Sequence, residues 1–404
     1  MKDTSLLQLA LGVAPPWRVA DSRFDAAAQR LDIDLDFTPG AKFACPACGA
    51  ANCPPHDTAP STWRHLNFFQ HQAYLHARVP RVRCMDCGVR KVAVPWARPD
   101  SGFTLLFEAV LMELVRAMPV AAAARLVGEH DTRLWRVVHH YVDEAVARID
   151  ASTVTRLAID ETAAARGHNY VSLFVDPDLA RVLFVAEGKD AATVGAFVKN
   201  LKLQGGRPQQ IRELCIDMSP AFIKGAADYL PAAQVTFDRF HAMKFVNRAV
   251  DQVRRAEQRA CHALKGSRYL WLSNPANLSE RQRKRLASLP AQAAQTARAY
   301  QIKLAFQDLY AQTRPEAAER FLKRWHFWAT HSRLQPVIDA AHTIRAHQPG
   351  ILRWFTSHIT NGLLEGLNSL VQAAKAKARG YRTYRNLKAM IYLLAGKLDL
   401  RLPA

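Results

Sequence analysis

Apolar positions along the chain change their spacing several times, and each spacing predicts a different kind of element. At Leu31, Ile33, Leu35 and Phe37 apolar residues alternate with polar ones, which predicts a strand. From about residue 103 they recur every three or four positions, which predicts helices. Later, short β-branched runs alternate with helical segments as far as residue 237, and this indicates an α/β sheet. Beyond that point nearly all of the spacing is helical.

The first helical stretch divides into three parts. Residues 103–118 present an apolar face, residues 120–127 predict a short helix, and residues 132–142 predict a third helix after a turn at Gly128. Two helices joined by a short turn that contains glycine are typical of a helix-turn-helix, whose second helix enters the major groove of DNA. Arg133 and Arg136 are then expected on its exposed early face. Helical hairpins that do not bind DNA share this pattern, so both interpretations stay open.

Three acids stand out by their positions in the later elements. We expect Asp160 to close a strand at 154–159, Asp217 to close a strand at 214–216, and Glu365 to lie on a helix that runs to Gly380. A strand, a hairpin, a helix and two further strands fit an RNase-H-like sheet, in which these carboxylates would meet. Such a cluster is repulsive unless divalent cations occupy it, and oxygen ligands suit Mg²⁺ or Mn²⁺. Each acid also has an ordinary alternative as a helix cap or a solvated side chain.

Two cysteine pairs carry the strongest metal signal. Cys45-x-x-Cys48 and Cys84-x-x-Cys87 are each followed by glycine, and two such turns can place four thiolates around one structural Zn²⁺. This spacing predicts a zinc ribbon with a hairpin between the two pairs, against the alternatives of unrelated thiols or a redox pair. Two nearby residues, Cys53 and His56, could replace a ligand. The strand before the second pair carries Arg81 and Arg83, which form either a phosphate-binding edge or a solvated strand face.

The composition of the chain indicates what class of partner it binds. The 404 residues include 55 Lys plus Arg against 35 Asp plus Glu, a formal net charge of +20. With 49% hydrophobic and 22% charged residues the chain is globular rather than disordered or fibrous, and its charge favours a polyanionic partner such as nucleic acid. No window approaches the roughly twenty apolar residues of a spanning helix. We therefore expect no membrane partner and a cytoplasmic, nucleoid-associated protein.

These features predict a multidomain α/β protein. An N-terminal arm and zinc ribbon would occupy residues 1–98, a helix-turn-helix residues 100–150, and an RNase-H-like catalytic domain residues 151–404. An all-helical insertion at about 249–350 would interrupt that last domain. Its tryptophans are expected in the core, with stacking on unpaired bases beside basic side chains as the alternative. Beyond the helix of Glu365 lie basic residues that either follow a DNA backbone or are merely solvated: Lys375, Lys377, Arg379 and Arg382.

Several runs resemble the DDE transposases of the ISL-three insertion-sequence family of bacteria. They include AIDET at 158–162, DMSP at 217–220, FDRFH at 237–241, KLAF at 303–306, NGLLEGLN at 361–368 and RGYR at 379–382. The cysteine pairs and the helix-turn-helix resemble the N-terminal half of the same family. The similarity therefore covers nearly the whole chain.

The resemblance implies both an activity and a set of site residues. The enzyme would bind the terminal inverted repeats of an insertion sequence and catalyse metal-dependent cleavage and strand transfer on double-stranded DNA. Asp160, Asp217 and Glu365 would hold two Mg²⁺ or Mn²⁺ ions, with the pair Asp238 and His241 near them. A homodimer is expected because two ends must be cut in concert. A non-catalytic DNA-binding regulator and a nuclease of the same fold are the alternatives.

Overall fold

The structure is a computed structural model that describes residues 3–403 apart from 166, 168, 290 and 360–361. Pro290, in the expected insertion, and Asn361, in one of the family-like runs, therefore lie outside the described residues. The chain forms two compact units. The first extends to Tyr141 and includes the residues from Asp399 onward, and the second runs from Val142 to Leu398. None of the described helices combines the length and the apolar character needed to cross a lipid bilayer.

The first unit consists of a sheet followed by three helices. Its elements are α1 (Asp3–Ala10), β1 (Trp17–Asp25), β2 (Arg30–Phe37), β3 (Pro55–Phe68), β4 (His71–Cys84), β5 (Gly88–Lys91), α2 (Leu105–Ala117), α3 (Val120–Val127) and the first part of α4 (Asp131–Ala147), whose last residues belong to the second unit. The strand order is β1-β2-β4-β3, with β5 pairing β4. The alternation predicted for β2 is confirmed, because Leu31, Ile33 and Leu35 are buried while the residues between them are partly exposed.

The helices of this unit follow the predicted pattern closely. The hydroxyl of Thr104 accepts a hydrogen bond from the Phe107 backbone N–H at 3.3 Å and caps α2. At the end of α3, Gly128 takes a left-handed backbone with φ of +70°, which allows the sharp turn into α4. α4 begins at Asp131 and continues to Ala147, beyond the predicted end at 142.

A buried arginine joins the sheet to these helices. Arg64 on β3 is 1% exposed, and its side chain forms an ion pair with Glu129, in the turn before α4, at 3.7 Å. The Arg64 backbone also exchanges two hydrogen bonds with the segment that precedes α2, from its N–H to the Gly102 carbonyl and from the Thr104 N–H to its own carbonyl. The sheet and the helix-turn-helix segment therefore pack as parts of one unit.

The second unit contains the predicted α/β sheet and a long helical segment. The first part consists of β6 (Arg156–Ala163), β7 (Tyr170–Asp176), β8 (Arg181–Glu187), α5 (Ala191–Leu203), a 3-10 turn at Pro208–Gln210, β9 (Glu213–Ile216), α6 (Pro220–Tyr229) and β10 (Gln234–Phe237). The strand order is β10-β9-β6-β7-β8. β6, β9 and β10 run parallel, whereas β7 is antiparallel to both β6 and β8.

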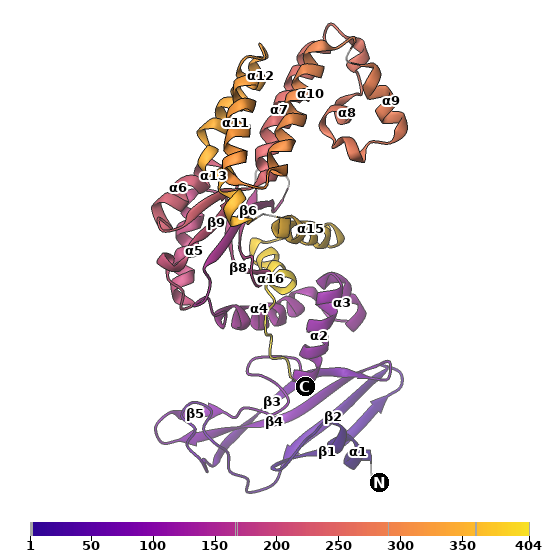
Figure 1. The fold of residues 1–404 in the computed structure, drawn as a ribbon. Coiled ribbons are helices and arrows are strands. Elements are labelled where there is room, and N and C mark those ends of the chain that lie inside the picture. The colour runs from indigo at the N-terminus through magenta and orange to yellow at the C-terminus, as the bar shows by residue number, and fades with distance from the viewer. Residues whose placement is uncertain (1–2, 166, 168, 290, 360–361, 404) are drawn as a thin grey trace. The chain divides into compact units, whose positions relative to one another are not determined.

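Helices cover both faces of this sheet. In Figure 1, α5 and α6 lie on one side of the strands, while α15 (Gly362–Lys377) and α16 (Tyr384–Ala395) lie on the other. The strands are correspondingly apolar, since β7 is buried from Val171 to Asp176. The sheet is thus an interior layer, and polar groups inside it need hydrogen-bonding partners or charge partners.

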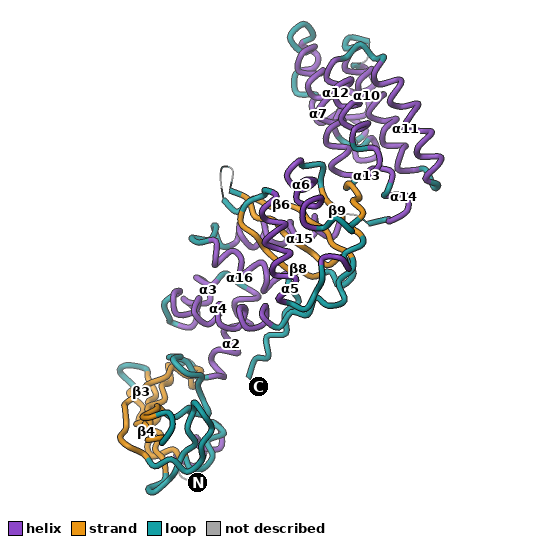
Figure 2. The backbone as a smooth tube through the Cα atoms, turned by 90° about the vertical axis from the view of Figure 1, so that its left-hand side faces the viewer, coloured by secondary structure: helices purple, strands orange, loops and turns teal. Residues whose placement is uncertain are grey.

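A helical segment extends from the edge of the sheet that carries β10. Its elements are α7 (Arg239–Glu257), α8 (Arg268–Leu272), α9 (Glu280–Ser288), α10 (Ala294–Gln307), α11 (Pro315–Thr330), α12 (Gln335–Ala346), α13 (Gln348–Leu352) and α14 (Trp354–Ser357), with 3-10 turns at His262–Leu264, Pro275–Asn277 and Asp308–Ala311. Figures 1 and 2 both show α7, α10, α11 and α12 side by side as a bundle. Trp271 and Trp325 are buried in it, as expected for core residues, but Trp328 is 42% exposed.

Candidate zinc and active sites

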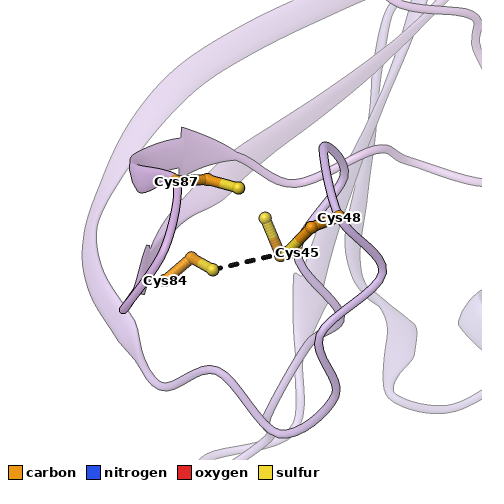
Figure 3. A group of neighbouring side chains, drawn as sticks. All are labelled: Cys45, Cys48, Cys84 and Cys87. Atoms are coloured by element: carbon orange, nitrogen blue, oxygen red, sulfur yellow. Dashed lines mark hydrogen bonds between the residues drawn. The ribbon is translucent and has the colours of Figure 1, made fainter.

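Four cysteines from the two turns gather at one end of the first sheet. The sulfur atoms of Cys45, Cys48, Cys84 and Cys87 all lie within 4.8 Å of one another, and their side chains converge in Figure 3. Backbone N–H groups of Cys48 and Ala47 lower the pKa of the Cys45 thiol to about 7, whereas the contact with Cys48 raises the pKa of the Cys87 thiol. Without a metal, the thiolate form is therefore favoured at Cys45 but not at Cys87. Four converging thiols fit a closed tetrahedral Zn²⁺ site.

Neither of the two alternative ligands belongs to this group of four. Cys53 is buried, and its sulfur lies 3.4 Å from the Ala50 carbonyl oxygen rather than in the group of four. His56 is outside the group as well, with its Nδ1 at 3.5 Å from a guanidinium nitrogen of Arg83. Two residues earlier on β4, Arg81 pairs through two nitrogens with the carboxylate of Asp57 on β3. Both arginines are exposed, but each already has a neighbour within the sheet.

The two arginines of the helix-turn-helix segment have different surroundings. Arg133 is only partly exposed: it forms an ion pair with Glu129, donates to the Gly102 carbonyl at 3.2 Å and lies 4.3 Å from the centre of the Phe103 ring. This differs from the expectation of an exposed side chain, because Glu129 draws the guanidinium toward the body of the unit. Arg136 is exposed as expected.

Asp160 lies inside β6 rather than at its end, which corrects the predicted strand boundary. β6 pairs with β9 only as far as Ala158, yet its pairing with β7 continues to Ala163. Asp160 therefore lies two residues beyond the last parallel pair, which joins Ala158 to Cys215. Burial raises the pKa of its carboxyl to about 6, although the Glu161 N–H and the nearby His241 act in the opposite direction. The charge of Asp217 adds to the rise.

Asp217 follows its strand as predicted, and Asp238 follows the neighbouring strand. Asp217 comes directly after β9, is half-buried, and accepts a hydrogen bond from the Ser219 N–H at 2.9 Å. Asp238 follows β10, is 2% exposed and caps α7 by accepting from the N–H groups of Phe240 and His241. The pKa of His241 is raised, chiefly by its side-chain hydrogen bond to Asp238 and further by the charges of Asp160 and Asp217. These four residues thus form one electrostatic group.

Glu365 is on the predicted helix but does not reach the other carboxylates. It lies in the first turn of α15 and is exposed. The residue one turn later, Asn368, donates from Nδ2 to Asp160 Oδ2 at 2.8 Å. Among the residues that the structure describes, only the four cysteines form a group with ligand atoms close enough for a metal. The three predicted carboxylates are therefore on neighbouring elements without being gathered.

Further contacts fix α15 against β6, and sequence reasoning missed these roles. Gln372 donates from Nε2 to Thr162 Oγ1 at 2.7 Å and to the Ala163 carbonyl at 2.9 Å, and Lys375 donates to the same carbonyl at 2.6 Å. The polar face shared by Asn368 and Gln372 was visible in the sequence, but which strand it contacts was not. Lys375 is thus engaged within the fold. Lys377, Arg379 and Arg382 are exposed at the end of α15 and after it.

Comparison with known families decides the identity of the chain. A family model described as a transposase matches residues 157–391, more than half of the chain. The chain belongs to the ISL3 family of transposases. The model of the helix-turn-helix domain of this family matches residues 92–142, and a model of the zinc finger of the transposases of IS204, IS1001, IS1096 and IS1165 matches residues 41–87. The predicted resemblance is confirmed.

Curated relatives agree with the family models over nearly the whole chain. The transposase for insertion sequence element IS1557 of Mycobacterium tuberculosis is 28% identical, and the match covers 98% of this chain and 96% of the relative. The transposase for insertion sequence element IS1001 of Bordetella parapertussis is also 28% identical, over 87% of this chain and 88% of the relative. This ISL3 transposase thus combines a zinc ribbon, whose four cysteines support a structural Zn²⁺, with a helix-turn-helix DNA-binding domain and a transposase domain.

Proposed function

We propose that this ISL3 transposase is a metal-dependent DDE enzyme that binds the terminal inverted repeats of its insertion sequence, cleaves them and joins them to target DNA. The observation that carries the proposal is the position of Asp160 and Asp217, each two residues beyond the last parallel pair of two adjacent strands, with α15 hydrogen-bonded to Asp160. The strand order β8-β7-β6-β9-β10, in which β7 alone runs against the others, supports an RNase-H-like fold for this domain.

The residues present fit a divalent-cation site. Asp160 and Asp217 offer carboxylate oxygens, the ligands that Mg²⁺ and Mn²⁺ prefer, and their mutual repulsion favours binding of a cation. Glu365, one helical turn before Asn368, is the proposed third ligand. When bound, two such ions would activate water or a DNA 3′-hydroxyl and stabilise the departing oxygen of an in-line displacement.

The surrounding side chains would prepare the site for DNA. Asp238 orients the His241 ring through Nδ1 at 3.3 Å and favours its protonated form, which places a positive charge beside the two acids. Asn368, Gln372 and Lys375 would hold α15, and with it Glu365, against β6. We propose that the protein acts as a homodimer, since two element ends must be cut together.

The test is strand cleavage at the boundary of the element. Purified protein is incubated with a duplex that carries the terminal repeat and with Mg²⁺ or Mn²⁺, and the strands are separated on a denaturing gel. Asp217→Asn should reduce nicking to background while DNA binding persists. Asp228→Asn removes the same charge from an exposed residue on α6 that pairs with Lys224, so it should nick like the wild type. Binding by the wild type without nicks in either metal would instead favour a non-catalytic regulator.

A further inference from the structure

A cavity of about 270 Å³ opens directly beside Asp217. One wall consists of the residues from Asp217 to Pro220, which connect β9 to α6, and the other is a face of α7. The α7 wall contributes His241, Lys244 and Arg248, together with the side chain of Phe245. A cavity that contains one of the proposed metal ligands is therefore bordered by basic side chains from a single helix.

The positions of these basic residues follow from helical geometry. At 3.6 residues per turn, positions 241, 244 and 248 fall on the same side of α7. Lys244 and Arg248 are both exposed. Within the described part of the chain neither side chain forms a hydrogen bond or an ion pair, so both can receive a ligand.

The other half of α7 shows that unpaired cations are not general on this helix. The carboxylate of Asp251 accepts a hydrogen bond from a guanidinium nitrogen of Arg254 at 2.8 Å. It also lies within 3.5 Å of guanidinium nitrogens of Arg255 and Arg268. Basic side chains at that end are thus neutralised by a carboxylate of the same helix. Unlike His241, which pairs with Asp238, Lys244 and Arg248 on the cavity wall have no carboxylate partner among the described residues, although the cavity is also lined by Asp217.

An exposed aromatic side chain extends the same face. Phe240 lies one turn before Lys244, is 59% exposed, and contacts the His241 ring edge-on with 6.0 Å between the ring centres. Aromatic rings beside Lys and Arg are the arrangement on which unpaired bases stack while the cations hold the strand.

We propose that this face of α7 binds the DNA strand next to the bond that is cut. Lys244 and Arg248, about 6 Å apart along the helix axis, hold successive phosphates of that strand, and Phe240 stacks against a base that has left the duplex. The site would offset the repulsion between the phosphates and the two acids. This inference rests on the proposed function, because it names the ligand of the cavity beside Asp217.

The first test measures how DNA affinity depends on salt. Each phosphate contact contributes roughly 0.9 to the slope of log K against log salt concentration. The double variant Lys244→Gln/Arg248→Gln should therefore lower the slope for a fluorescent terminal-repeat duplex by about 1.8. The matched variant Lys224→Gln/Arg255→Gln removes two exposed charges that already have carboxylate partners, so it should keep the wild-type slope.

The second test locates the contacts on the strand. Duplexes are prepared in which one phosphate beside the cleavage position is replaced by a neutral methylphosphonate. The replacement should weaken binding of the wild type but have little further effect on the double variant, because the contact is already lost. Phe240→Ala should lower nicking of an intact duplex more than nicking of a duplex already unpaired at that position.

The outcomes separate this inference from the proposed function. Failure of the wild type to nick in Mg²⁺ or Mn²⁺ overturns the proposed function, whereas the salt slope still reports on α7. A double variant that folds with the wild-type melting temperature and keeps the wild-type slope and nicking rate overturns the inference, even if Asp217→Asn is inactive. Equal sensitivity of both proteins to every methylphosphonate overturns it as well.

Discussion

Lys303 illustrates how a single polar residue can stabilise the helical segment. Its side chain is fully buried, and Nζ donates to the carbonyl oxygens of Trp271, Leu272 and Ser273 at 2.9–3.0 Å. These carbonyls lie at the end of α8, where a helix leaves its last acceptors without partners. A buried ammonium group needs such acceptors as much as they need a donor. Lys303, the first residue of the KLAF run, is therefore explained by its structural role rather than by catalysis.

Replacing Lys303 by methionine should destabilise the protein although it removes a buried charge. Loss of the donor leaves buried carbonyls unsatisfied, and the expected decrease in the free energy of unfolding is about 1–3 kcal/mol. Urea unfolding of the variant measures it. Lys284→Met, at an exposed residue of α9 paired with Glu280, should remain close to the wild type. A Lys303→Met protein as stable as the wild type would contradict the capping role.

His65, in the first unit, makes the free energy of unfolding depend on pH. Burial, and then the adjacent charge of Arg64, lower the pKa of its imidazole from 6.5 to about 4. Between these values the unfolded chain binds a proton that the folded chain does not, so the free energy of unfolding falls as the pH falls. His65 also shares a hydrogen bond of 2.9 Å with the Thr104 hydroxyl, at the N-terminus of α2.

Acid should therefore destabilise the wild type more than His65→Gln. Thermal unfolding in the presence of zinc gives, for each protein, the change in melting temperature between pH 7 and pH 5, and these two changes are compared. His130→Gln is the control, because its side chain is 73% exposed and its loss should not change the pH response. If the His65→Gln protein lost as much stability on acidification as the wild type, the assigned protonation would be wrong.

At the scale of elements, strand pairing explains why β6 is longer than the sequence pattern predicts. The sequence pattern predicts that β6 stops before Asp160, because its apolar run ends there. The pairing with β7 continues to Ala163, and a strand lasts as long as one neighbour supplies hydrogen bonds. The end of the parallel pairing, not the end of the strand, places Asp160 beside Asp217. Such a register cannot be read from one strand alone.

The zinc content of the ribbon should depend on each of its four cysteine ligands. Cys48→Ser should reduce the zinc content from about one ion per chain to almost none, because a structural site needs all four ligands. Cys53→Ser should retain the metal, since that sulfur lies outside the group. A colorimetric assay of zinc released by a thiol reagent checks both. Loss of zinc from Cys53→Ser alone would reassign the ligand set.

For the whole molecule, local chemistry was more predictable than contacts between distant segments. The four cysteines and the helix-turn-helix segment follow from spacing, because each motif lies within a short stretch. Pairing such as Asn368 with Asp160 joins residues far apart in the sequence, and no periodicity encodes it. The ion pair of Arg64 with Glu129 was missed for the same reason, and it also changes the surroundings of Arg133.

The order of the elements has a consequence during synthesis of the protein. The ribbon and the helix-turn-helix are complete by Ala147, whereas α15 begins only at Gly362, close to the end of the chain. A ribosome that stops early, or a nonsense mutation in the second half of the gene, would therefore release a fragment with the DNA-binding elements and without Glu365. Under the function proposed above, such a fragment is expected to occupy element ends without cutting them. Decay of the gene by truncation would thus produce an inhibitor of the remaining intact copies.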